Sequence, residues 1–186
     1  MIQTENLNSA SLAIAGIGRA VDLSEQAHAE GHYVVECFGA DGKLKWTDGF
    51  DNLVTTVGKN FALDTVLSGA AYTAAWYVGL VSITGYSAVA SGDTAASHAG
   101  WTEDQNYSQS SRPSASFSAA SGGSKSLSAA AVFSMNANTT IKGCFLISNS
   151  TKGGTTGTLY SAGLFTGGDK VLQNGDTLNV SYSASM

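Results

Sequence analysis

The residues best suited to chemistry gather in one polar stretch near the middle of the chain. His98 lies between Asp93 on one side and Glu103 and Asp104 on the other. A histidine beside carboxylates can bind a metal ion or exchange protons with a substrate. No residue of this stretch belongs to a recognisable nucleophile motif. We therefore expect His98 to be a loop residue that hydrogen-bonds to the backbone, and we assign no catalytic residue.

The other candidate metal ligands are two histidines and two cysteines. His28 and His32 have the spacing of neighbours on one helix face, but Gly31 between them marks the point where we expect a strand to begin. Cys37 and Cys144 are too far apart in sequence for a compact zinc motif, and each lies in an apolar, strand-like run. We expect buried, reduced thiols, no metal site and no cofactor.

The composition excludes several classes of protein. The chain has 186 residues, a net charge of −5 and only 12% charged residues, so a basic nucleic-acid-binding surface is not expected. It contains no apolar run of about 18 residues, which argues against a membrane span. No basic region precedes the first apolar stretch, so we expect no signal peptide and synthesis in the cytoplasm.

Residues 1–31 differ from the rest and are predicted to form an N-terminal arm. The apolar run at 11–18 is too short and too rich in glycine to form a domain. We expect the arm to pack on the body of the protein or on a neighbour. Its candidate interface residues are Leu12, Ile14 and Ile17. The body is expected to comprise residues 32–186.

Short strands dominate the predicted body. Residues 32–48 are predicted to form a hairpin. The Asp-Gly pair at 41–42 separates a β-branched and aromatic run at 33–38 from a second run, in which Leu44 and Trp46 alternate with polar residues. Residues 74–83 are apolar on both faces, as in a central strand covered on both sides. The last third of the chain repeats short alternating runs separated by glycine turns. The predicted fold class is mainly β, a β-sandwich or jelly-roll-like body.

One helix is predicted, over residues 52–67. Asn52 is the candidate N-cap, with Asp51 beside the positive helix end, and Gly69 is placed to end the helix. The apolar residues of its predicted buried face are Leu53, Val54, Val57, Phe61 and Val66. We expect the helix to lie across one face or one end of a sheet.

A long polar connection follows the predicted central strand, from Thr84 to Arg112. Connections of this length in a compact domain usually carry function or contact a partner. Within it, Trp101 is the most credible contact residue, with His98 beside it, and Arg112 reads as an isolated surface charge. The remaining surface is rich in Ser, Thr, Gly, Ala and Asn. Such short side chains lose little entropy in a contact, which suits assembly.

Several segments, in order, resemble virion structural proteins of tailed bacteriophages. The resemblance covers roughly residues 33–182. The segments that carry it are 41–46 (DGKLKW), 52–58 (NLVTTVG), 74–80 (AAWYVGL), 92–94 (GDT), 97–101 (SHAGW), 149–160 (NSTKGGTTGTLY) and 175–180 (GDTLNV).

Within that group, the resemblance implies a capsid decoration, or cement, protein. Such proteins lie outside the major capsid protein lattice as dimers or trimers and hold neighbouring capsomers together, and several have jelly-roll-like bodies. The expected partners are therefore the major capsid protein and further copies of this chain. The expected location is the outer surface of the virion head, after synthesis in the host cytoplasm. The resemblance implies no catalytic residues.

Two alternatives from other functional classes stay open. A tail, fibre or receptor-binding protein would bind a host glycan or protein through Trp101 and the loop 84–112, although the sequence shows no fibre-like repeat. A glycan hydrolase would need two placed carboxylates, and Asp93 with Glu103 or Asp104 is the pair the loop offers.

Overall fold

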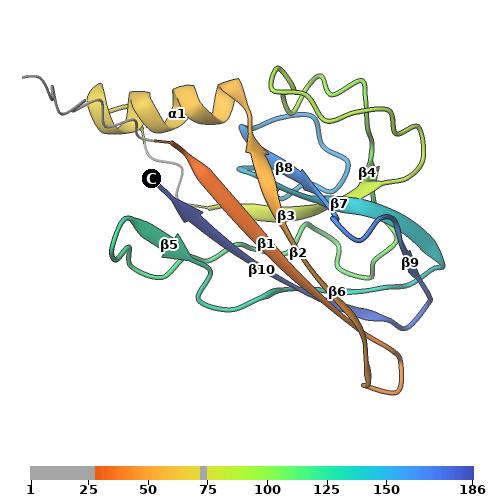
Figure 1. Cartoon of the computed structure of the whole chain (residues 1–186). Coiled ribbons are helices and arrows are strands. Elements are labelled where there is room, and N and C mark those ends of the chain that lie inside the picture. Colours follow the sequence, from red (N-terminus) through yellow and green to blue (C-terminus); the bar gives the residue numbers. More distant parts are fainter. Residues whose placement is uncertain (1–27, 72–74) are drawn as a thin grey trace, which may run out of the picture.

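The structure, a computed structural model, describes residues 28–71 and 75–186. These residues form ten strands and one α-helix (Figure 1). The elements are β1 (Glu30–Phe38), β2 (Leu44–Val54), α1 (Thr56–Leu67), β3 (Tyr77–Ser82), β4 (Glu103–Asp104), β5 (Ser124–Ser126), β6 (Ala131–Ser134), β7 (Thr139–Ile147), β8 (Leu159–Leu164), β9 (Lys170–Leu172) and β10 (Thr177–Ser185). The predicted fold class, a mainly β body with one helix, is confirmed.

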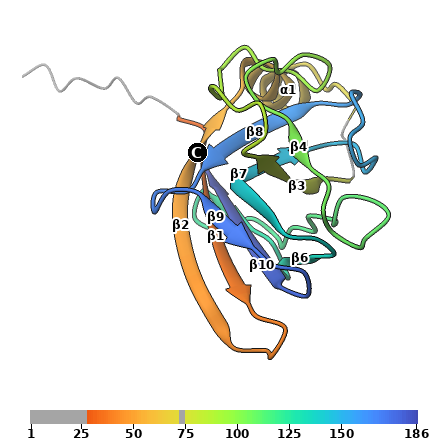
Figure 2. The ribbon, with the colours of Figure 1, turned by 90° about the vertical axis from the view of Figure 1, so that its right-hand side faces the viewer.

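All strand pairs are antiparallel and follow the order β4-β3-β7-β8-β2-β1-β10-β5, with β6 added to β10 and β9 added to β7. We call β2, β1, β10, β5 and β6 sheet A, and β4, β3, β7, β8, β9 and the end of β2 sheet B. Figure 2 shows the two sheets as facing layers, with β2 curving between them. The continuous order makes the sandwich a single sheet folded over on itself.

β2 is the strand that joins the two layers. Most of it pairs with β1, from Leu44 opposite Phe38 to Asp51 opposite His32. Its last three residues pair with β8 instead, beginning with Asn52 opposite Gly163. A Cβ atom on Gly163 would meet the Asp51 carbonyl oxygen at 2.9 Å, so the crossing requires a residue without a side chain.

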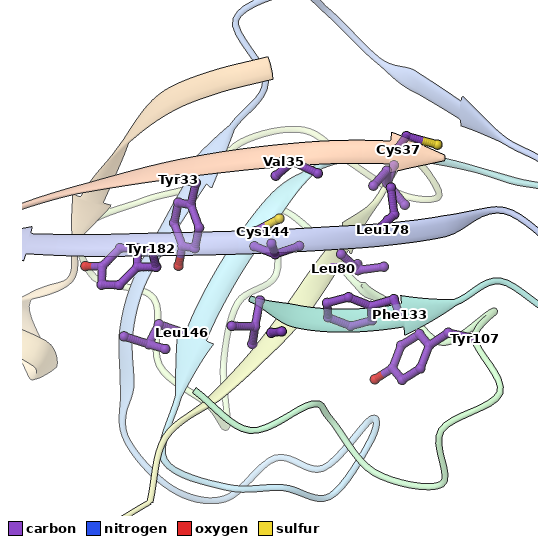
Figure 3. Close-up of a cluster of buried hydrophobic side chains, with 14 of the residues drawn as sticks. Tyr33, Val35, Cys37, Leu80, Tyr107, Phe133, Cys144, Leu146, Leu178 and Tyr182 are labelled. Atoms are coloured by element: carbon purple, nitrogen blue, oxygen red, sulfur yellow. The ribbon is translucent and has the colours of Figure 1, made fainter. Parts of the chain in front are cut away.

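The main core lies between the sheets, where the alternating apolar residues of both inner faces meet (Figure 3). It includes Tyr33, Val35 and Cys37 of β1, Leu178, Val180 and Tyr182 of β10, Leu80 of β3, and Cys144 and Leu146 of β7. Both cysteines are free and buried, as predicted. Burial raises the pKa of the Cys37 thiol to about 11 and raises that of Cys144 as well, so both thiols stay protonated at neutral pH.

A second, smaller core covers the other face of sheet B. Val81 of β3 and Phe145 and Ile147 of β7 point away from the main core and are covered by the loop that contains Ala95 and Trp101. β3 is therefore buried on both sides, as its apolar sequence predicted. A loop, rather than a helix or a further sheet, supplies the second cover.

The prediction for the start of the helix is wrong by four residues. Asn52 is not an N-cap, because β2 continues through Val54 to pair with β8. Thr55 is the N-cap, and its side chain accepts a hydrogen bond from the Gly58 amide at 3.0 Å. The predicted end is correct, since the helix stops at Leu67 and Gly69 has a φ of +63°.

α1 lies across one end of the sandwich, as expected (Figure 1). Gly58 is its one buried residue and packs against the Tyr160 backbone of β8, while the Phe61 ring meets the Trp76 ring edge-on at 5.5 Å. The predicted buried face is only partly correct. Leu53 and Val54 belong to β2 instead of the helix, and Val66 is 77% exposed.

The predicted arm lies mostly outside the described residues, and this includes Leu12, Ile14 and Ile17. The first described strand, β1, begins at Glu30, two residues before the predicted start of the body.

Gly58→Ala tests whether packing against β8 or helix propensity has the larger effect on the stability of α1. Alanine favours a helix by about 1 kcal/mol over glycine, but the new methyl group would collide with the Tyr160 carbonyl group. Overpacking of this kind costs about 1–3 kcal/mol. We therefore expect a lower free energy of unfolding, measured by urea denaturation.

The matched control is Asn60→Ala, at an exposed position of the same helix. It gains helix propensity without a collision, so it should leave stability equal or slightly higher. A stabilised Gly58→Ala variant would show that α1 is free to move away from β8.

Candidate interaction surfaces

Trp101 and His98 form a stacked pair within the loop that covers sheet B. Trp101 is only 2% exposed, and its indole N–H donates to Asp93 Oδ2 at 2.9 Å. The His98 ring stacks on the indole at 4.1 Å between centroids, and His98 Nδ1 donates to the Trp101 carbonyl oxygen at 2.9 Å. The expected backbone hydrogen bond of His98 is thus present. Because Trp101 is buried, its indole shapes the loop surface but offers little area of its own to a partner.

The three carboxylates predicted as a possible hydrolase cluster belong to separate networks. Asp93 holds the indole of Trp101, whereas Glu103 accepts two hydrogen bonds from Arg112. Asp104 accepts from the Thr139 hydroxyl at 2.5 Å. Each carboxylate therefore has its own hydrogen-bond donors within the fold, and each fixes a different part of the loops.

Arg112 is the centre of the largest of these networks. Its guanidinium donates to both oxygens of Glu103, at 2.9 and 2.8 Å, and the two side chains are 3% and 5% exposed. It also donates to the carbonyl oxygens of Asn149 and Gly154, and it lies 5.4 Å from the centre of the Phe145 ring. The sequence prediction of an isolated surface charge is wrong. The partners of Arg112 come from distant stretches, so no local pattern reveals them.

Neither histidine near the N-terminus takes part in a metal site within the described chain. Across residues 28–71 and 75–186, no group of three or more His, Cys, Asp and Glu side chains is placed to hold a metal ion. His32 pairs instead with Asp51, with 2.7 Å between Nδ1 and Oδ1. The same described ranges contain no helix long and apolar enough to cross a membrane.

The outward side of sheet A is a broad face of mainly short side chains, which we call the outer A face. Three rows of directly opposed residues cross it: Gly49, Val34 and Ser181; Thr47, Glu36, Asn179 and Val132; and Asp51, His32, Ser183 and Ser126. Each of these residues is exposed or half-buried. The described rows include two carboxylates and no lysine or arginine, so few charges would need desolvation in a contact.

Two exposed valines lie on the outer A face. Val34 is 38% exposed and Val132 is 43% exposed. Beside Val34, a shallow hollow of about 210 Å³ is lined by His32, Leu127 and Ser181 among others. The face therefore offers small apolar contacts among polar and mainly short side chains.

A second, more apolar surface surrounds α1. One groove of about 300 Å³ lies between the helix and the ends of β8 and β10, and a second of about 320 Å³ lies on the other side, towards the chain termini. Ala62 and Val66 line both grooves. We call them together the α1 grooves. Leu63 is 56% exposed, and Leu67 and Met186 are 77% and 67% exposed.

The sequence of this chain is distinct from the family models and the curated proteins compared with it. No family model matches it, and no curated protein is significantly similar to it. The geometry of the surfaces and the resemblance of the sequence segments are therefore the basis for a functional proposal.

Replacing Glu103 with leucine should destabilise the protein strongly. The change would leave the Arg112 guanidinium buried without its carboxylate, which costs about 3–5 kcal/mol in comparable pairs. Replacing both residues, as Glu103→Leu with Arg112→Met, removes the unpaired charge and should recover part of that loss. Urea unfolding of the three proteins measures both effects.

The control is Lys43→Met, which breaks an exposed ion pair with Asp41. Exposed pairs contribute at most about 1 kcal/mol, so this variant should unfold almost like the unaltered protein. If the double variant were less stable than Glu103→Leu alone, the buried charge would not be the dominant cost.

Proposed function

We propose that this chain is a non-enzymatic structural protein of a bacteriophage virion. It binds the outside of the major capsid protein lattice and cements neighbouring capsomers against the pressure of packaged DNA. The observation that carries the proposal is the outer A face, together with the resemblance of the sequence segments to virion structural proteins.

The outer A face suits repeated docking on a protein lattice for two physical reasons. Serine, threonine and glycine lose little rotamer entropy when a partner covers them, unlike lysine and glutamate. Few charges on the face also means a small cost of desolvation. Val34 and Val132 add apolar area that a partner can cover.

The charged residues of the chain also support the proposal, because many of them form ion pairs that stabilise the body. Lys170 donates to Asp48 at 2.7 Å across the sandwich, and Lys45 donates to Asp176 at 2.6 Å. Burial acts to raise the pKa of Asp48, but hydrogen bonds from Lys170, Thr166 and Gly167 outweigh it, so the pKa is lowered. A body held together by such ion pairs resists deformation when a mechanical load acts on it.

In this mechanism, the contacts made by many copies of the chain add together. Stable protein contacts typically bury about 1,600 Å² in total, and each copy that spans two capsomers adds contacts on the outside of the shell. A copy held by one capsomer meets the next at high effective concentration, so weak individual contacts suffice. Further copies of this chain, as dimers or trimers, are the second partner in this proposal.

A receptor-binding role in the tail or a fibre is the second candidate, and one hollow favours it. The loops 84–112 and 149–157 meet around a hollow of about 210 Å³, lined in part by His98, Thr102 and Thr155. Its polar rim and the stacked ring of His98 are the kind of lining that a glycan needs.

Copy number and location on purified virions decide between the two. A decoration protein should be present at a near-stoichiometric ratio to the major capsid protein on a stained gel, with density on the outside of the head in electron micrographs. A ratio of a few per cent, with label on the tail, would instead support receptor binding.

A charge pair on the outer A face should weaken attachment to the head. Val34 and Ser181 are direct cross-strand neighbours, so Val34→Glu with Ser181→Lys keeps the strands compatible while adding two charges to desolvate. We expect at least about tenfold weaker binding to heads that lack the protein, since 1.4 kcal/mol suffices for that factor. Co-sedimentation with such heads measures it.

The matched control places the same pair on sheet B, as Val171→Glu with Thr140→Lys, which are also cross-strand neighbours. Val171 is 67% exposed and lies on β9, outside the outer A face. This variant should bind like the unaltered protein. If both double variants bound heads equally well, the outer A face would not be the surface that binds the head.

A further inference from the structure

The outer side of α1 is unusually apolar for a helix at a protein surface. A surface helix normally turns its apolar stripe toward the core and its polar stripe toward water. Here the side chains of Leu63, Val66 and Leu67 are 56–77% exposed. They are among the large apolar side chains that are exposed in the described chain. A contiguous apolar surface of this kind marks a place where another segment docks.

The α1 grooves adjoin each other at α1 and together form a cradle, with Val66 lining both. The lining of the first groove includes the aromatic residues Trp76, Tyr160 and Tyr182, and that of the second includes Met186. An occupant of matching chemistry would be short, apolar and narrow.

The chain itself carries such a segment, at residues 12–17. We propose that the α1 grooves are the docking site for this segment, Leu12 to Ile17, of the same chain. The described chain begins at His28 and Ala29, and both of these residues line the second groove. The 27 residues that precede them therefore join the body at the edge of the cradle, and residues 11–18 are their apolar part.

Chain length permits the docking. Ten residues, 18–27, connect Ile17 to His28 and can span about 33 Å when extended. The 12-residue helix α1 is only about 18 Å long, so the segment can reach either groove. A six-residue segment spans about 20 Å when extended, which is close to the length of the helix.

Charge also favours this occupant. Lys59 lies on one groove and Lys125 on the other, and within the described chain neither has an ion-pair partner. The residues that flank the apolar run are acidic on balance, because Glu5, Asp22 and Glu25 outnumber Arg19. A tether of ten residues keeps the segment at a millimolar effective concentration, which a second copy reaches only in concentrated solution.

This inference concerns the isolated protein and holds whether or not the chain binds a capsid. The α1 grooves share no residue with the rows that define the outer A face, although Tyr182 lines both the first groove and the hollow beside Val34. Failure of head binding would therefore leave the docking of residues 12–17 intact, and the reverse is also true.

Cysteine crosslinking in the full chain tests the proposal. Ile14→Cys is combined with Val66→Cys, and the dilute protein is treated with a short bismaleimide linker. The two native cysteines are buried with raised pKa values, so they should not compete. We expect a link within one chain, identified by mass spectrometry of the monomer band, with a yield independent of protein concentration.

The matched control combines Ile14→Cys with Val171→Cys, another exposed valine, 67% against 77% for Val66. The Val66 pair should give at least about fivefold more link within the chain, as expected for a docked rather than a freely moving segment. Equal yields from the two pairs would overturn the proposal. A link that joins two chains would overturn it too, in favour of an exchanged arm. Both substituted valines are exposed, so loss of folding is not expected.

Discussion

The architecture depends on one strand, β2, which belongs to both sheets. Hydrogen bonding runs without interruption from β1 through β2 to β8, so the two layers cannot separate without breaking a strand. Asp48 adds a second tie, because its carboxylate reaches Thr166, Gly167 and Lys170 beyond β8. The position of α1 follows from the same strand. Because β2 ends at Val54, the helix must begin at the end of the sandwich.

This dependence explains which parts of the fold could be predicted from the sequence. The β-branched and aromatic run at 33–38 and the Asp-Gly turn at 41–42 are local signals, and the hairpin of β1 and β2 follows from them. The start of the helix is not a local signal. Asn52 resembles an N-cap, but pairing with Gly163, more than a hundred residues away, keeps it in a strand. Tertiary pairing overrides the local preference there.

The loop between β3 and β4 shows a second limit of local reasoning. Its length and polarity suggested a contact with a partner, yet Trp101 is buried against Phe145 of β7. The sequence did contain the necessary clue, because a strand that is apolar on both faces needs a cover on each side. Arg112 offered no such clue. Its partners, Glu103, Asn149 and Gly154, are fixed only once the loops have folded.

The two unpartnered surfaces differ in chemistry, and the difference bears on what each can bind. The outer A face combines short polar side chains with isolated valines, so contacts made through it would be weak one by one and would gain strength only from repetition, as on a lattice. The α1 grooves are lined by aromatic and aliphatic side chains, and leaving them in water carries a standing cost of about 25 cal/mol for each Å². A partner met only during assembly would leave that cost unrelieved in the free protein. A segment of the same chain would relieve it from the moment of folding, so the chemistry of the two surfaces favours different partners.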